Sequence, residues 1–171
     1  MDINALQKIQ YGVYIVSSQF DGKKSAQLAN CVFQITSNPI QFAASLSKQN
    51  FTCELLEGSG KLAISSLSED APFKFMGKFG FQSGRNTDKF SNVEYIVMQN
   101  GTPAITSYAT AIYELEVKNK INLTTHILFI AEVSDMKIID RSKNAMTYDY
   151  YHKIKGGLTS KNAPTYIQKP L

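Results

Sequence analysis

Cysteine and histidine are scarce in this sequence, and their scarcity excludes several kinds of metal centre. Cys31 and Cys53 are the only cysteines among 171 residues, and they do not form a C-x-x-C pair. A zinc ribbon or an iron site needs more thiolate ligands than these two, so neither is expected within this chain. The two histidines, His126 and His152, are too few to indicate a metal site. Each cysteine is therefore expected to be a small buried hydrophobe, and no metal is predicted.

Long apolar runs and dense basic runs are also missing. The longest apolar stretch, 127–131, is far shorter than the roughly 20 residues of a membrane-spanning helix. Residues 1–4 contain no basic segment that leads into an apolar one, so no secretion signal is predicted. Lysine and arginine nowhere form the patch that binds nucleic acid or a membrane surface. We therefore expect a cytoplasmic protein with no nucleic acid partner and no membrane partner.

Three common catalytic signatures are absent as well. The sequence contains no nucleophile elbow of the serine hydrolases, no G-x-G-x-x-G and no G-x-x-x-x-G-K-[ST]. These absences argue against a serine hydrolase, a Rossmann enzyme and a P-loop enzyme. The net charge of +4 is mild, and a modest positive charge of this kind would attract an anionic cofactor.

What is present is typical of one globular, mostly β domain over residues 1–171. Apolar residues make up 43% and charged residues 19%, which is the balance of a folded chain. Segments rich in Val, Ile and Tyr, bounded by turn residues, predict strands over 11–18, 26–36, 41–46, 62–67, 94–98, 108–117 and 126–139. Helices are expected over 52–56 and 71–79, and a hairpin connection over 119–122.

This pattern predicts an antiparallel barrel with a few short peripheral helices. The tail, 148–171, reads as irregular, and its tyrosines need the barrel or a partner subunit to pack on.

The first of two polar loops, 79–90, carries candidate phosphate-binding groups. Ser83, Arg85 and Lys89 supply a hydroxyl and two cations beside Gly84. Backbone N–H groups freed by glycine, together with such cations, suit a phosphate dianion. The same residues are also typical of an ordinary solvated turn, and this alternative stays open.

The second polar loop, 45–52, joins the end of a strand to the start of a helix. Ser47, Lys48, Asn50 and Thr52 surround the helix N-terminus, whose free N–H groups and positive dipole end attract anions. A capped helix with solvated neighbours is the alternative. Two loops that could each bind a phosphate are less expected to occur by chance in one small barrel than a single such loop. Their occurrence together therefore favours a phosphate site.

Asn30, Cys31 and His126 are candidates for contacts to a flat ring. Asn is depleted in strands, so Asn30 and Cys31 interrupt a strand, and backbone groups exposed there would suit the edge of a heterocycle. A β-bulge is the alternative. His126 begins a strongly apolar strand, and beside a redox cofactor it would steady a negative charge or orient a nicotinamide. A polar strand end without a chemical role is the alternative.

In their order and spacing, these segments resemble the flavin reductase-like family, which has the FMN-binding split-barrel fold. The resemblance is carried by 12–18, 29–30, 34–36, 38–39, 50–52, 79–80, 83–85, 88–90, His126 and Tyr148. The tail 150–166 is similar to a narrower branch that holds flavoredoxins and the flavin-binding halves of high-molecular-weight rubredoxins. The resemblance implies a mostly β, antiparallel Greek-key split β-barrel, and a homodimer with one FMN per subunit near the interface.

The resemblance also implies a role for each matching residue. The isoalloxazine ring would be lined, largely through backbone, by Ala29, Asn30, Cys31 and Val32. The ribityl chain and phosphate would be held by Ser45, Ser47, Asn50 and Thr52, with Leu46 and Phe79 in the same site. The phosphate side would be closed by Ser83, Arg85 and Lys89.

His126 matches the end of a Gly-Asp-His motif linked to nicotinamide binding in many relatives, and this chain has Thr124-Thr125-His126 there. The resemblance implies an oxidoreductase that passes electrons from NADH or NADPH through FMN to flavin, a rubredoxin or another redox protein. The chain lacks the four cysteines of a rubredoxin, so a rubredoxin partner would be a separate protein. Two alternatives stay open: a flavoredoxin-type carrier with permanently bound FMN and no nicotinamide site, and a non-redox binding barrel.

Overall fold

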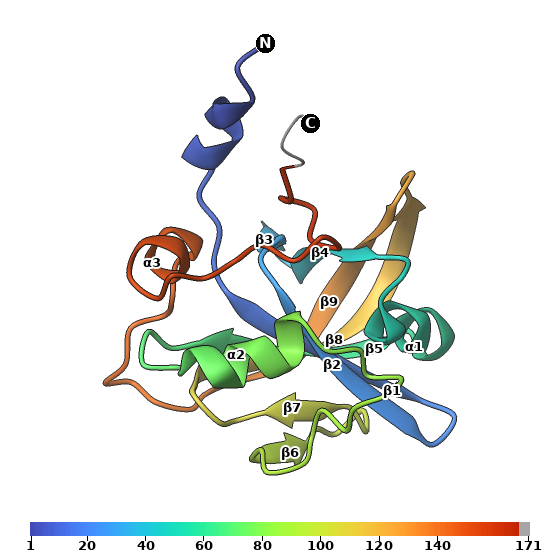
Figure 1. Ribbon diagram of the computed structural model, residues 1–171. Coiled ribbons are helices and arrows are strands. Elements are labelled where there is room, and N and C mark those ends of the chain that lie inside the picture. The colour runs from blue at the N-terminus through green and yellow to red at the C-terminus, as the bar shows by residue number, and fades with distance from the viewer. Residues whose placement is uncertain (168–171) are drawn as a thin grey trace.

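The computed structural model describes residues 1–167, and its centre is a seven-stranded sheet in which every pairing is antiparallel. The order across this sheet is β2-β1-β5-β8-β9-β4-β3 (Figure 1). Its strands are β1 (Tyr14–Phe20), β2 (Lys23–Ala29), β3 (Val32–Ser37), β4 (Ile40–Ser47), β5 (Lys61–Leu67), β8 (Ala109–Asn122) and β9 (His126–Ile138). A separate pair consists of β6 (Tyr95–Val97) and β7 (Pro103–Ile105). The predicted mostly β, antiparallel architecture is confirmed.

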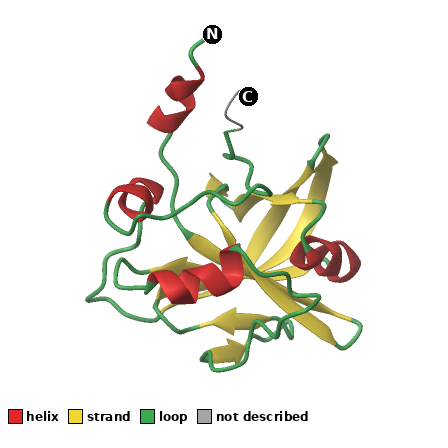
Figure 2. Cartoon of the chain, viewed as in Figure 1, coloured by secondary structure: helices red, strands yellow, loops and turns green. Residues whose placement is uncertain are grey.

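Helical segments of the described chain lie around the sheet, as Figure 2 shows. They are η1 (Ile3–Lys8), α1 (Phe51–Ser59), α2 (Phe73–Gly80) and α3 (Tyr148–Lys153). Helix α1 packs on β1 and β2, and helix α2 packs on β2. Helix α1 ends at Gly60, whose left-handed backbone (φ 66°) closes the last turn. Within residues 1–167, no helix is long and apolar enough to cross a membrane.

Three apolar clusters form the core, and neighbouring residues of β1 contribute to the two that lie beside the helices. Val16 packs in one cluster with Leu56 of α1 and Phe129 of β9. Ile15 packs in the other cluster with Met76 of α2. Successive side chains of a strand point to opposite faces, so β1 contributes to both clusters. Helices α1 and α2 are thereby both held against β2, next to β1, and the candidate site lies between them.

The strands differ from the sequence prediction in three main places, and one of them is β7, a strand that the sequence did not predict. The strand expected over 26–36 is divided at Asn30–Cys31, because β2 ends and β3 begins on either side of this pair. The hairpin connection expected at 119–122 lies inside β8, and the turn falls at 123–125 instead. Polar residues are tolerated here because the end of this hairpin is exposed, so polarity alone did not mark the turn.

The C-terminal segment begins with a helix that the sequence did not predict. The Thr147 side chain accepts a hydrogen bond from the Tyr150 backbone N–H at 3.1 Å and so caps α3. Tyr151 is buried in the core, and Tyr148 packs beside it. After α3, residues 154–167 form neither helix nor strand. The end of the expected tail, 168–171, lies outside the described residues.

Candidate functional site

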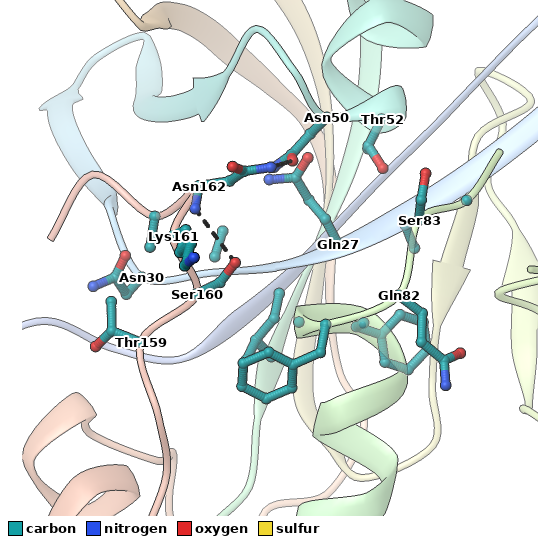
Figure 3. A pocket seen from close by; sticks show the side chains of 18 of the residues that line it. Gln27, Asn30, Asn50, Thr52, Gln82, Ser83, Thr159, Ser160, Lys161 and Asn162 are labelled. Atoms are coloured by element: carbon teal, nitrogen blue, oxygen red, sulfur yellow. Dashed lines mark hydrogen bonds between the residues drawn. The ribbon is translucent and has the colours of Figure 1, made fainter. Parts of the chain in front are cut away.

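A cavity of about 500 Å³ lies where the end of β2, the start of α1, the end of α2 and the C-terminal segment meet. Its walls come from residues 25–30, 49–52, 79–84 and 158–163, together with tyrosines of α3. Figure 3 shows polar side chains from these separate segments around one space. Cofactor and ligand sites commonly have volumes of about 300–1,000 Å³. The cavity is therefore the candidate functional site.

The start of α1 provides the helix end that the sequence predicted. Asn50 occupies the N-cap position, yet its side chain makes no capping hydrogen bond; its Oδ1 instead accepts a hydrogen bond from Asn162 Nδ2 at 3.0 Å. Thr52 is buried, and its Oγ1 donates to Ser25 Oγ at 3.0 Å. The first N–H groups of a helix lack intrahelical acceptors and lie at the positive dipole end. An anion in this part of the cavity would be stabilised.

The loop that follows α2 closes against this helix start. A Cβ atom on Gly84 would overlap Ser25 Oγ and lie 3.3 Å from the Phe51 ring, so the close approach requires glycine. Ser83 and Thr52 consequently line the same cavity (Figure 3). The two loops that the sequence offered as phosphate-binding segments thus converge on one space.

A second, more basic hollow of about 530 Å³ adjoins the cavity and shares Phe51 with it. Lys23, Lys24 and Arg85 are among the residues that line this hollow. The Arg85 guanidinium lies 4.9 Å from the centre of the Phe51 ring and pairs with Glu54 at 2.5 Å. About half of each of these two charged side chains is exposed. Arg85 therefore stands at the rim of the cavity and does not line it.

Lys89 also does not line the cavity, which corrects its expected place beside a phosphate. The residue is 2% exposed, and its Nζ donates to the backbone carbonyl of Lys78 in the last turn of α2 and to that of Gln82 in the loop that follows. Burial, and to a smaller extent the Lys78 ammonium, lowers the pKa of Lys89 to about 8. The last carbonyls of a helix lack intrahelical donors, and a cation there satisfies them. Lys89 thereby fixes the loop that carries Ser83.

The end of β2 brings an unsatisfied polar group into the cavity. Gln27 is 9% exposed, and its buried Oε1 has no hydrogen-bond partner within residues 1–167. A buried acceptor without a donor costs about 1–3 kcal/mol, and a ligand that brings an N–H group would remove this cost. Ala29 and Asn30 line the cavity as expected, and so does Phe79, whose ring is apolar. This combination suits a flat ring with a polar edge.

Five other residues expected at the cofactor do not line the cavity. They are Cys31, Val32, Ser45, Leu46 and Ser47. Val32 and Leu46 are part of the core instead, because side chains alternate along β3 and β4 and only some can face the site. Burial raises the pKa of the Cys31 thiol to about 11, so this thiol is neutral at pH 7. Cys53, by contrast, is buried in the core as a small hydrophobe, as predicted.

His126 lies next to the C-terminal wall of the cavity and does not itself line it. Its Nε2 is 3.2 Å from the backbone carbonyl oxygen of Asn162, which is a lining residue. Its Nδ1 is 2.8 Å from Thr125 Oγ1. The structure therefore connects His126 to the site through Asn162.

Sequence reasoning missed two parts of the wall. Ser25 and Gln27 share a strand face with Ala29, so they could have been found once β2 was recognised as a strand. Residues 158–163 carried a weaker signal, namely the tyrosines and the glycine pair that precede them. No periodic pattern indicates that this segment covers the cavity.

Comparisons with known proteins point to one family. The flavin reductase like domain matches residues 6–156. The chain is 39% identical over 168 residues to the ferric-chelate reductase (NAD(P)H) of Archaeoglobus fulgidus. The matched region covers 98% of this chain and 99% of that protein. It is also 38% identical over 166 residues to the high molecular weight rubredoxin of Moorella thermoacetica. Here the matched region covers 97% of this chain and 72% of the relative. The solved NADH:FAD oxidoreductase of Streptomyces globisporus shares the fold, with a TM-score of 0.74 at 18% identity over 84% of each chain.

Proposed function

This chain belongs to the flavin reductase-like family and is an oxidoreductase, and from this premise we propose that it binds FMN and transfers electrons from NADH or NADPH. The proposed acceptor is free flavin, a separate rubredoxin or another redox protein. A relative named as an NAD(P)H ferric-chelate reductase and another named as a rubredoxin support a nicotinamide donor and a redox-protein acceptor. The observation that carries the proposal is the convergence of the α1 start and the 82–84 loop on one cavity.

The residues present in the cavity fit FMN. The N–H groups at the start of α1, together with Thr52 and Ser83, would hold the single phosphate, and Arg85 would add a cation at the rim. Gln27 and the backbone at Asn30 would meet the polar edge of the ring. A phosphate at one end and a ring edge at the other would fix the depth of the cofactor in the cavity.

Bound FMN would supply hydride acceptance and one-electron transfer, which are properties of the flavin ring. The chain's own residues would bind and orient it. Phe79 would exclude water from part of the cavity, and the helix end would hold the anion. His126, which contacts the lining residue Asn162 but does not itself line the cavity, is the proposed contact for a nicotinamide.

An anaerobic titration tests this proposal and separates it from its alternatives. The purified protein is loaded with FMN, with FAD as the comparison, and is then mixed with NADH or NADPH while flavin absorbance is followed. We expect FMN to bind more tightly than FAD and to bleach promptly with one of the two donors. Tight FMN that never bleaches would instead identify an electron carrier, and a protein that binds neither flavin would overturn the proposal.

Arg85 tests the position of the phosphate. We expect Arg85→Ala to weaken FMN binding by about 1.5 kcal/mol, or about tenfold, because a charge-assisted contact is lost. Glu54→Gln is the matched control: it removes the competing carboxylate, so FMN affinity should stay equal or rise slightly. Isothermal titration with FMN measures both variants. Unchanged affinity in Arg85→Ala would remove this residue from the site.

The proposal also includes a homodimer, as the family resemblance implies. No residue of η1 is buried, and Ile3, Leu6 and Ile9 are between 44% and 52% exposed. Figure 1 shows this N-terminal segment extending away from the sheet. A helix this short is not stable without packing, so we propose that a second copy covers its apolar side chains. Light scattering after size exclusion checks this, and a monomeric mass would contradict it.

A second candidate function is the flavoredoxin-type electron carrier. One observation favours it: both ring nitrogens of His126 already have partners within the chain, Thr125 and Asn162. In this arrangement His126 has no free nitrogen for a nicotinamide. A carrier would exchange electrons between proteins and would not need one.

A further inference from the structure

Residues 158–166, called the strap here, include the C-terminal wall of the cavity (158–163), and this segment is held differently from the other walls. None of its residues is buried, and it contains no helix or strand. Side-chain hydrogen bonds attach it: Asn162 Nδ2 donates to Asn50 Oδ1 at 3.0 Å, and Asn30 Nδ2 donates to Thr165 Oγ1 at 2.7 Å. Tyr148 Oη also lies 2.7 Å from Thr159 Oγ1 and 3.3 Å from Thr165 Oγ1. Each such bond contributes only about 0.5–1.5 kcal/mol net. A segment held in this way can open without unfolding the domain.

The strap has one fixed end, at α3. The Gly157 N–H donates to the Tyr151 carbonyl at 2.9 Å, and Tyr151 Oη donates to the Leu158 carbonyl at 3.0 Å. A Cβ atom on Gly157 would overlap the Tyr151 ring, so the chain is pressed against this buried side chain. Gly156, just before it, has the left-handed backbone (φ 63°) that turns the chain into the strap. Thr159 is held as well, because its Oγ1 lies 2.7 Å from Tyr148 Oη. Movement of the strap would therefore begin beyond Thr159.

The strap also determines which nitrogen of the neutral His126 ring carries the proton. A backbone carbonyl only accepts hydrogen bonds, so the Nε2 atom that faces the Asn162 carbonyl must carry a proton. In the neutral ring, Nδ1 then accepts from the Thr125 hydroxyl. His152 shows the opposite arrangement, because its Nδ1 lies 2.8 Å from the Gly157 carbonyl. The chain's two histidines are thus held as opposite tautomers.

We propose that the strap is a latch that competes with the electron donor for His126, and that Asn162 is the residue that positions it. When seated, the strap closes the cavity and occupies the His126 Nε2–H. When released from Asn50, it frees this N–H for the carboxamide of a nicotinamide. The competition rests on the proposed function, whereas the placement of the strap and the ring tautomers does not.

Ring nitrogen spectra of the flavin-free protein test the latch without reference to activity. The chain has two histidines, so ¹⁵N-histidine labelling gives two ring systems, and His152→Gln assigns them. In the neutral form of each ring, we expect an Nε2–H tautomer for His126 and an Nδ1–H tautomer for His152. In Asn162→Ala, His126 should move to averaged tautomers while His152 stays unchanged. An averaged or Nδ1–H His126 ring in the wild-type protein would overturn the latch.

Kinetics of the FMN-loaded protein test the competition. Asn162→Ala should raise the FMN dissociation rate about tenfold, because the closed state loses a bond that holds it. The same variant should lower the KM for the nicotinamide about threefold, because a larger share of molecules has His126 free. A residue with only a structural role would worsen both quantities together, and that result would reject the competition.

Two further variants serve as controls. Asn50→Asp keeps an acceptor for the Asn162 amide, so it should retain the wild-type His126 tautomer. Tyr166→Phe changes an exposed strap side chain that does not line the cavity, and its spectra and rates should match those of the wild-type protein. Loss of the His126 tautomer in Tyr166→Phe would contradict the assignment of the latch to Asn162. A protein that binds no flavin yet shows the expected tautomers would reject the proposed function and the competition with it, and would leave only the placement of the strap and its hold on the His126 ring.

Discussion

The cavity has two unlike walls, one built from the core and one from the strap. The wall made by β2, α1 and the 82–84 loop includes buried residues such as Thr52, and Gly84 leaves no room for a side chain. The opposite wall, 158–163, is half-exposed or exposed throughout, and a few hydrogen bonds hold it in place. The core-built wall is therefore already in its binding shape, whereas the strap can leave.

This difference assigns different tasks to the two walls. A preformed wall loses little conformational freedom on binding, so it should set affinity for the flavin. A weakly held wall has a low opening free energy, so it should set how quickly ligands enter and leave. Substitutions in the first wall should therefore change the equilibrium affinity for the flavin, and substitutions in the strap should mainly change how fast the flavin exchanges and how easily the nicotinamide reaches His126.

The largest effect should come from Gly84→Ala in the core-built wall. The added methyl group would displace Ser25, break its hydrogen bond to Thr52 and move the loop. Overpacking of this kind costs about 1–3 kcal/mol, so we expect FMN affinity to fall roughly thirtyfold. Fluorescence titration with FMN measures it.

Gly77→Ala is the matched control, because its new Cβ would meet only the Phe81 ring edge at 3.9 Å within the described chain. Inside α2 this change should leave affinity unaltered and raise stability slightly, since alanine favours a helix over glycine. If Gly84→Ala bound FMN as well as Gly77→Ala, the core-built wall would not be the preformed part of the site.

The next effect concerns the support of that wall by Lys89. We expect Lys89→Met to lower the free energy of unfolding by about 2 kcal/mol, because the carbonyls of Lys78 in α2 and Gln82 just after it lose a charged donor. The control is Lys74→Met, which changes an exposed lysine of α2. It should change the free energy of unfolding by less than about 0.5 kcal/mol. Urea unfolding compares the two variants. Equal losses would show that the buried position of Lys89 is unimportant.

The stability difference between the wild-type protein and Lys89→Met should also depend on pH. The folded pKa of Lys89, about 8, lies below its ordinary value of 10.5. Between these values the unfolded chain binds more protons than the folded one, so the wild-type protein gains stability as pH rises. The variant lacks this titration, and the gap should widen between about pH 8 and 10. A gap that narrows would mean that the folded pKa is raised.

The sequence was enough to predict the core-built wall in outline but not the strap. The antiparallel strands and the start of α1 follow from alternation and turn residues, and Asn50, Thr52 and Ser83, which the sequence placed in two separate loops, line one cavity. Lys89 was misplaced because a basic residue in a polar loop gives no sign that two carbonyls bury it. Two of the strap's hydrogen bonds span more than 100 residues of sequence, those from Asn162 to Asn50 and from Asn30 to Thr165. Such distant pairing leaves no local pattern.

The smallest change in stability, and the clearest sign of a separable strap, should come from Thr165→Val. This substitution removes the acceptor for Asn30 Nδ2 and a weaker contact to the Tyr148 hydroxyl. We expect the free energy of unfolding to fall by less than about 1 kcal/mol, while trypsin cleaves after the exposed Lys161 about fivefold faster, because cleavage tracks local opening. Tyr166→Phe should be cleaved at the wild-type rate. If cleavage and the urea midpoint changed in proportion, the strap would open only with global unfolding, and the two walls would be one unit.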